Sequence, residues 1–267
     1  MAVGYIMRID VLTLFPNMFS AYTGESILQR AQSAGLISLR THNIRDYAEG
    51  KHRVTDEPPY GGGGGMILKP DPIFKAVESI VAEDPTMKPK VILLSPQGRL
   101  LTHAVAVELS AEPWLIFLCG RYEGVDERVR EHLVDDEISI GDYVLTGGEL
   151  AALVTIDALA RHIPGVLGDE DAAEHDSHST GLLEGPHYTR PEVFRDWRVP
   201  EVLRSGHAGR IRRWRREAAL RRTWEHRPDL LLTAELDEED KLFLMTLAQE
   251  ITNHTINGQP GNERKNG

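Results

Sequence analysis

Two glycine-rich turns are the segments of this chain best suited to hold a ligand. The first, Gly120-Arg121-Tyr122-Glu123-Gly124, comes directly after an apolar run at 114–119, and the second, at 140–148, contains Gly141, Gly147 and Gly148. Glycine has no Cβ, so the backbone can approach a ligand or another backbone closely there. The spacing alone fits a ligand held by main-chain groups, and it fits ordinary loop geometry equally well.

The elements that must position these turns are alternating strands and helices. Apolar runs at 7–14, 36–41, 90–95 and 114–119 are typical of buried strands, and the segments 27–35, 71–83, 102–109 and 148–163 have helical spacing. This alternation predicts an α/β domain with a parallel sheet covered on both faces. Ligands of such sheets bind at the carboxyl ends of the strands. Ser95 to Gly98 and Gly120 to Gly124 both follow predicted strand ends, so we expect both to border the ligand site.

The helix predicted at 148–163 carries an apolar side, and an acidic segment follows it. We expect the buried positions of this helix to be Leu150, Leu153, Val154, Ala158 and Leu159. Residues 168–180 contain five acids and neither lysine nor arginine, which indicates a linker. The predicted organisation is therefore a first domain at 7–166, an acidic linker at 167–181, a helical domain at 182–256 and a disordered tail at 257–267.

Charge is distributed unevenly along the chain. The formal net charge is −11, yet residues 190–227 hold twelve arginines and five acids, a net charge of +7 that leaves −18 for the remainder. Tryptophans at 197, 214 and 224 lie among these arginines. The pattern favours contact with a polyanion such as RNA, and a solvated arginine-rich helix is the alternative.

Several site classes are excluded by the sequence. Cys119 is the single cysteine, so there is no intramolecular disulfide and no multi-cysteine zinc site. No GxGxxG follows the first predicted strand, and no Gly-Lys-Ser/Thr follows the five consecutive glycines at 61–65, so Rossmann and Walker phosphate sites are absent. No apolar run has membrane-spanning length and no signal peptide opens the chain, so we expect a cytoplasmic protein without a membrane partner.

Seven short motifs carry a resemblance to a known family. They are MRID at 7–10, PYGGG at 59–63, SPQG at 95–98, GRYEGVDERV at 120–129, SIGDYVLTGGE at 139–149, GPHYTRP at 185–191 and IRRWR at 211–215. Across most of its length the chain resembles the bacterial tRNA (guanine-N1)-methyltransferase family. The resemblance implies a SPOUT-type α/β fold, in which a deep trefoil knot forms the cofactor pocket, and a small, mainly helical C-terminal domain. It also implies S-adenosylmethionine as the methyl donor, N1 of the guanosine at tRNA position thirty-seven as the acceptor, and a homodimer whose active site lies at the subunit interface.

The resemblance also assigns roles to individual residues. Guanine N1 carries a proton, so its methylation needs a base. Asp176 matches the family's general base, with Asp169 and Asp171 as alternatives, and Arg161 matches the residue that stabilises negative charge on the nucleobase. Glu123 is a candidate to hold the base or a magnesium ion whose ligands are otherwise unknown. The expected cofactor contacts are Ser95, Pro96, Gln97, Gly98, Gly120, Glu123, Ser139, Ile140, Gly141, Asp142, Tyr143, Val144, Leu145, Gly147 and Gly148. The expected RNA contacts are Arg190, Arg212, Arg213 and Arg215.

Some positions depart from the family pattern, and other functions compete with this one. Leu93 and Ala151 stand where the family often has tyrosine and proline. From the residues alone, Asp176 is also explained as a solvated linker acid and Arg161 as a cation near a helix C-terminus. The competing functions are a related enzyme acting on ribosomal RNA or on ribose, a non-catalytic RNA-binding protein, and a nucleotide-binding switch that uses the glycine run.

Overall fold

The structure is a computed structural model that describes residues 6–168 and 176–257. The chain divides into two compact units, unit 1 at Met1–Glu170 and unit 2 at Asp171–Gly267. Residues 169–175, which hold most of the predicted acidic linker's acids, and residues 258–267 of the predicted tail lie outside the described part. Within the described residues, no helix has both the length and the apolar character needed to cross a membrane.

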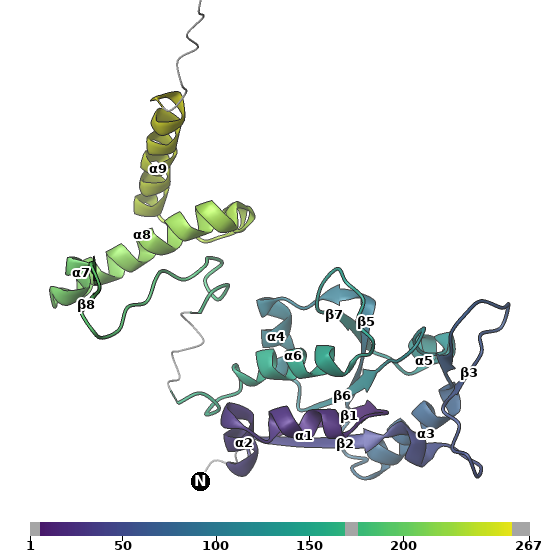
Figure 1. Ribbon diagram of the computed structural model, residues 1–267. Helices are drawn as coiled ribbons and strands as arrows, with labels where there is room; N and C mark the ends of the chain where they lie inside the picture. Colours follow the sequence, from purple (N-terminus) through teal and green to yellow (C-terminus); the bar gives the residue numbers. More distant parts are fainter. Residues whose placement is uncertain (1–5, 169–175, 258–267) are drawn as a thin grey trace, which may run out of the picture. The chain divides into compact units, whose positions relative to one another are not determined.

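Unit 1 is built on a five-stranded parallel sheet with the order β2-β1-β6-β5-β7 (Figure 1). Its strands are β1 (Met7–Thr13), β2 (Ile37–Asn43), β5 (Lys90–Leu100), β6 (Trp114–Cys119) and β7 (Asp136–Ser139). All four neighbouring pairs run parallel. The predicted parallel α/β sheet is therefore confirmed. The short strand β7, which carries only four residues, was not predicted.

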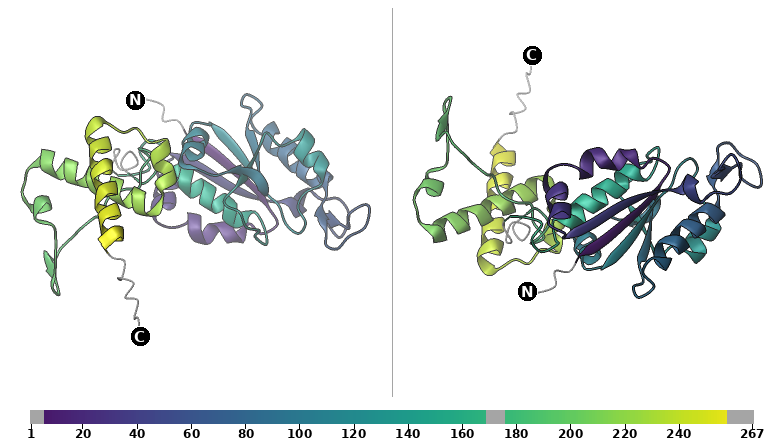
Figure 2. Two further views of the ribbon diagram at one scale, coloured as in Figure 1. Left: turned by 90° about the horizontal axis from the view of Figure 1, so that it is seen from above. Right: turned by 90° about the horizontal axis from the view of Figure 1, so that it is seen from below.

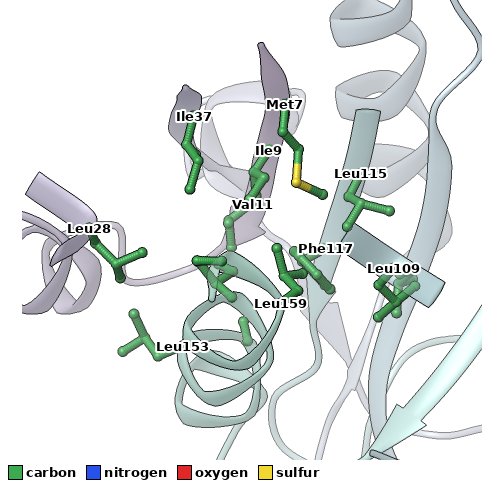
Figure 3. Packing of buried hydrophobic residues seen from close by; sticks show 14 of the residues in the cluster. Met7, Ile9, Val11, Leu28, Ile37, Leu109, Leu115, Phe117, Leu153 and Leu159 are labelled. Atoms are coloured by element: carbon green, nitrogen blue, oxygen red, sulfur yellow. The ribbon is translucent and has the colours of Figure 1, made fainter. Parts of the chain in front are cut away.

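Helices cover both faces of this sheet. On one face lie α1 (Asn17–Thr23), α2 (Ser26–Ser33), α4 (His103–Ser110) and α6 (Glu149–Ala160), packed on alternate residues of the strands (Figure 3). From β1 this face receives Met7, Ile9 and Val11. The other face carries η1 (Ile44–Tyr47), α3 (Pro70–Ala82) and α5 (Glu127–His132), packed against Leu12, Trp114, Ile116 and Leu118. Both faces of the sheet are buried, as expected for a parallel sheet. A ligand site is therefore expected at the strand ends, which the helices leave uncovered.

Two sequence predictions about unit 1 are wrong in detail. The strand predicted at 90–95 continues to Leu100, with a shift of register between Leu94 and Arg99, so Ser95 to Gly98 lie within an irregular part of β5. On α6, Leu150 and Val154 are 53% and 47% exposed, although both were expected to be buried. Nearly every position from 150 to 156 is apolar, so the periodicity does not define one buried side.

Unit 2 is mainly helical. It contains the short hairpin β8 (Val193–Phe194) and β9 (Trp197–Arg198), then α7 (Glu201–Arg204), α8 (Ala208–His226), η3 (Pro228–Leu232) and α9 (Glu238–Asn257). Its small core includes Leu182, Leu220 and Leu247. The Thr223 hydroxyl of α8 accepts a hydrogen bond from the Leu183 N–H at 2.9 Å. Leu183, at the start of the predicted helical domain, is therefore held against α8.

Candidate functional site

A pocket lies at the carboxyl ends of β6 and β7 and beside the irregular part of β5. Along the chain, β6 forms on one side of β5 and β7 forms on the other side. This reversal of strand order leaves a crevice in open α/β sheets, which is where they bind ligands. The lining comes mostly from three segments, namely Ser95 to Gln97, Gly120 to Val125 and the stretch from Ile138 to Gly148, with Leu93, Leu94, Arg130 and Ala151 completing it.

Most of the predicted cofactor residues are brought together here. The pocket is lined by Ser95, Pro96, Gln97, Gly120, Glu123, Ser139, Ile140, Gly141, Tyr143, Val144, Leu145, Gly147 and Gly148. Gly98 and Asp142 do not line it. A Cβ on Gly98 would lie 2.4 Å from the carbonyl carbon of Glu137, so this glycine lets β5 approach β7. Leu93 and Ala151 also line the pocket.

The two glycine turns contact each other through their backbones. Gly148 N–H donates to the Gly120 carbonyl at 2.9 Å, and a Cβ on Gly148 would lie 2.8 Å from Cys119 Cα. A Cβ on Gly147 would meet the Arg121 side chain at 2.2 Å. Real Cβ atoms do not approach other atoms so closely, so the backbone contact requires glycine at position 148, and a side chain at position 147 would displace Arg121. The glycine spacing therefore reflects close packing of two backbones that together form a wall of the pocket.

A buried acid that sequence reasoning missed supports this wall. Glu149, 1% exposed, pairs with Arg121 (Nη2 to Oε2, 2.9 Å) and accepts a hydrogen bond from the Thr13 hydroxyl at 2.7 Å. Arg121 also donates to the Thr146 carbonyl at 3.3 Å, and its guanidinium lies 4.5 Å from the centre of the Phe15 ring. Arg121 thus joins both glycine turns to the start of α6. The available signal was an acid in the first turn of a helix, where the helix dipole favours negative charge.

Cys119, at the end of β6, is structural. Its side chain is fully buried, and burial together with the nearby Glu149 raises the pKa of the thiol well above its ordinary value. A neutral, buried thiol is a poor nucleophile. This agrees with the sequence interpretation of a small core residue.

The five-glycine loop borders the pocket through Glu123. The loop lies between β3 (Asp56–Glu57) and β4 (Ile67–Leu68), and it contacts the first glycine turn where Glu123 N–H donates to the Met66 carbonyl at 3.0 Å. A Cβ on Gly65 would lie 2.5 Å from Glu123 Oε1, so the Glu123 side chain sits directly against this glycine. Among residues 6–168 and 176–257, no group of three or more His, Cys, Asp or Glu side chains could hold a metal ion.

The predicted base and its cationic partner belong to different units. Arg161, half-buried, ends α6 in unit 1. Asp176, also half-buried, lies in unit 2, where its carbonyl accepts hydrogen bonds from Ser179 N–H at 3.2 Å and from the Ser179 hydroxyl at 2.7 Å. The alternative bases Asp169 and Asp171 lie outside the described residues.

The predicted RNA-contacting arginines divide into two groups. Arg213 is held inside unit 2, where it pairs with Glu217 at 2.8 Å and with the buried Asp240 at 3.1 Å. Arg190, Arg212 and Arg215 are exposed, and no carboxylate within the described ranges pairs with them. Part of the positive charge seen in the sequence is thus neutralised locally by α9, and the exposed arginines remain available to a polyanion.

Comparison with known proteins identifies relatives over nearly the whole chain. Residues 7–233 match the family model described as tRNA (Guanine-1)-methyltransferase TrmD. A protein of Dehalococcoides mccartyi is 60% identical over 91% of this chain and 98% of its own length. Proteins of Anoxybacillus flavithermus (57% identical over 89% of this chain and 97% of theirs) and Bacillus cereus (54% over 91% and 100%) are also similar. All three carry the name tRNA (guanine-N(1)-)-methyltransferase. The chain therefore belongs to the tRNA (guanine-1)-methyltransferase TrmD family and is a methyltransferase enzyme.

Proposed function

We propose that this enzyme transfers a methyl group from S-adenosylmethionine to N1 of the guanosine at tRNA position thirty-seven, acting on tRNA in the cytoplasm. The observation that carries the proposal is the pocket at the ends of β6 and β7 and beside the irregular part of β5, in a chain of this family. Its lining suits such a donor because glycines expose main-chain groups to a polar adenosine and amino acid, while Leu94, Ile138 and Ala151 offer apolar contact. We assign the cofactor site to residues 7–166 and tRNA binding to residues 182–256, with the acidic linker between them.

The proposed reaction needs alignment and removal of one proton. S-adenosylmethionine supplies an electrophilic methyl group on a sulfonium centre. The pocket walls hold the donor in one orientation, which favours an in-line displacement. Asp176 takes the proton from guanine N1, and Arg161 stabilises the negative charge that develops on the guanine oxygen. Both roles rest on the resemblance to the family, and both side chains are half-buried.

The proposed mechanism does not use a magnesium ion. Glu123, which lines the pocket, is our candidate to hold a magnesium ion or the base. The described residues hold no cluster of three or more His, Cys, Asp or Glu around it that could complete a metal site. No step is therefore assigned to the ion.

We also infer a homodimer with the active site at its interface, and a trefoil knot around the pocket. In support of the dimer, Met18 and Tyr22 on α1 and Leu150 and Val154 on α6 are exposed, and the Tyr22 hydroxyl donates to Asp157 of α6 at 3.0 Å. Exposed apolar side chains on adjoining helices mark interaction surfaces. In support of the knot, the chain that follows β7 returns to the turn after β6, where the backbones of Gly120 and Gly148 are hydrogen-bonded.

The test uses two tRNA transcripts that differ only in having guanosine or adenosine at position thirty-seven. The protein is incubated with methyl-labelled S-adenosylmethionine, and the variants are Asp176→Asn and, as a matched control, Glu78→Gln on the exposed side of α3. We expect label on N1 of the guanosine transcript alone, lost in Asp176→Asn and retained in Glu78→Gln. Label on both transcripts would refute the target position. An unlabelled RNA that still binds would support the non-catalytic alternative.

A further inference from the structure

The β8–β9 hairpin of unit 2 presents two aromatic rings to solvent. Phe194 and Trp197 are directly paired across the strands, so their side chains share one face, and their ring centres are 6.1 Å apart. They are 57% and 66% exposed. In both views of Figure 2 the hairpin stands away from the helices of unit 2. A two-stranded hairpin cannot bury its own aromatic residues, so these rings remain available to a partner.

A cation accompanies the rings. Arg195, in the two-residue loop between the strands, places its guanidinium 5.4 Å from the Phe194 ring centre and 5.7 Å from that of Trp197. The backbone of Arg195 has a φ of +56°, which lies in the left-handed region. The tip of the hairpin therefore combines two flat apolar surfaces with the planar cation of Arg195 and the exposed carboxylate of Asp196.

The base of the hairpin is fixed to α7. Val199 N–H donates to the Glu192 carbonyl at 3.0 Å, and the Glu192 carboxylate pairs with Arg204 of α7 at 3.0 Å. These contacts hold the first and last residues of the hairpin together. The rings are thus presented on a supported element, which reduces the entropy lost when a partner binds.

We propose that the Phe194–Trp197 face is a stacking platform for an unpaired nucleobase of the substrate RNA. This inference rests on the proposed function, because it takes tRNA as the bound partner. Aromatic faces stack on any base, and arginine beside them adds cation–π and phosphate attraction. The exposed Arg190 and Arg198 add further positive charge close to the hairpin in the sequence. A protein partner fits less well, since two residues on a hairpin offer far less than the roughly 800 Å² per partner of a stable protein interface.

The experiment compares Trp197→Ala with Trp197→Phe and with Leu232→Ala, which removes another exposed apolar side chain of unit 2. Binding of full-length enzyme to tRNA is measured over a range of salt concentrations, along with the KM for tRNA and S-adenosylmethionine binding. We expect Trp197→Ala to weaken tRNA binding and raise the KM by roughly tenfold or more. The phenylalanine variant should retain most of the affinity, and Leu232→Ala should match the wild type.

The salt dependence separates stacking from charge. Trp197→Ala should leave the slope of log affinity against log salt unchanged, because no phosphate contact is lost, whereas Arg212→Ala should reduce it by about one. Wild-type tRNA affinity in Trp197→Ala would overturn the platform, and so would an equal loss in Leu232→Ala. Dissociation of a dimer by Trp197→Ala would assign the face to a second copy of the chain instead. If the wild type methylates no tRNA yet binds it through Trp197, the proposed function fails while the platform stands.

Discussion

Glu149→Gln tests whether the buried ion pair with Arg121 holds the pocket in shape. The substitution removes a negative charge and keeps the size of the side chain, so the Thr13 hydroxyl still has an oxygen to donate to. Arg121 loses its carboxylate partner while its side chain is only 17% exposed. The guanidinium then lies in a largely desolvated place without a counter-charge.

The expected loss of stability in Glu149→Gln depends on the contacts that Arg121 retains. Removing one partner of a buried ion pair costs about 3–5 kcal/mol. Arg121 retains its contact with the Phe15 ring and its hydrogen bond to the Thr146 carbonyl, and it reaches solvent in part. We therefore expect about 3 kcal/mol, at the lower end of that range. Donor binding should weaken as well, because the turns that Arg121 joins form a wall of the pocket.

The assay is urea unfolding followed by circular dichroism, with calorimetric titration of S-adenosylmethionine. Glu78→Gln, an exposed change of the same chemistry, is the control. The double variant Arg121→Met/Glu149→Gln should recover part of the lost stability, since the stranded charge is gone. Unchanged unfolding midpoints and donor affinity in Glu149→Gln would refute the reasoning.

Three further outcomes are expected. Hydrogen bonds from Arg99 and then Lys90 lower the pKa of Glu108 from 4.5 to about 2, so its stabilising effect is present above pH 4.5 and is lost toward pH 2. Glu108→Gln should therefore lower the urea midpoint at pH 7, slightly because the side chain is half-exposed, and the difference from wild type should shrink at pH 3. Cys119 should resist iodoacetamide at pH 9 in the native protein and react in urea, as mass spectrometry can show; rapid native labelling would contradict its burial. Arg213→Ala should destabilise unit 2 in thermal unfolding, while Arg212→Ala should weaken only tRNA binding, and equal melting of the two variants would contradict the division between them.

The sheet and the position of the pocket could be predicted because they depend on local pattern. Buried strands of a parallel sheet read as apolar runs, and ligands lie at their carboxyl ends whatever their detailed sequence. Glycines at 120 and 148 marked the site for the same reason, since close backbone approach needs a residue without a Cβ.

Features that depend on long-range contacts could not be predicted. Nothing near Glu149 in the sequence indicates its pairing with Arg121 or Thr13, which lie 28 and 136 residues away. Arg213 looks like its exposed neighbour Arg212 until α9 brings Asp240 against it. The exposure of Leu150 and Val154 likewise depends on where the sheet meets α6, because that helix is apolar on nearly all sides.

The glycine wall of the pocket has a consequence for inhibition. A small molecule seated against Gly120, Gly147 and Gly148 meets main-chain groups, which no amino-acid substitution can remove. Adding a side chain at position 147 or 148 to block the compound would drive a Cβ into Arg121 or into the backbone of Cys119. Mutational escape is therefore restricted at this wall, whereas Leu93 and Ala151, which line the same pocket with side chains, are where resistance should arise.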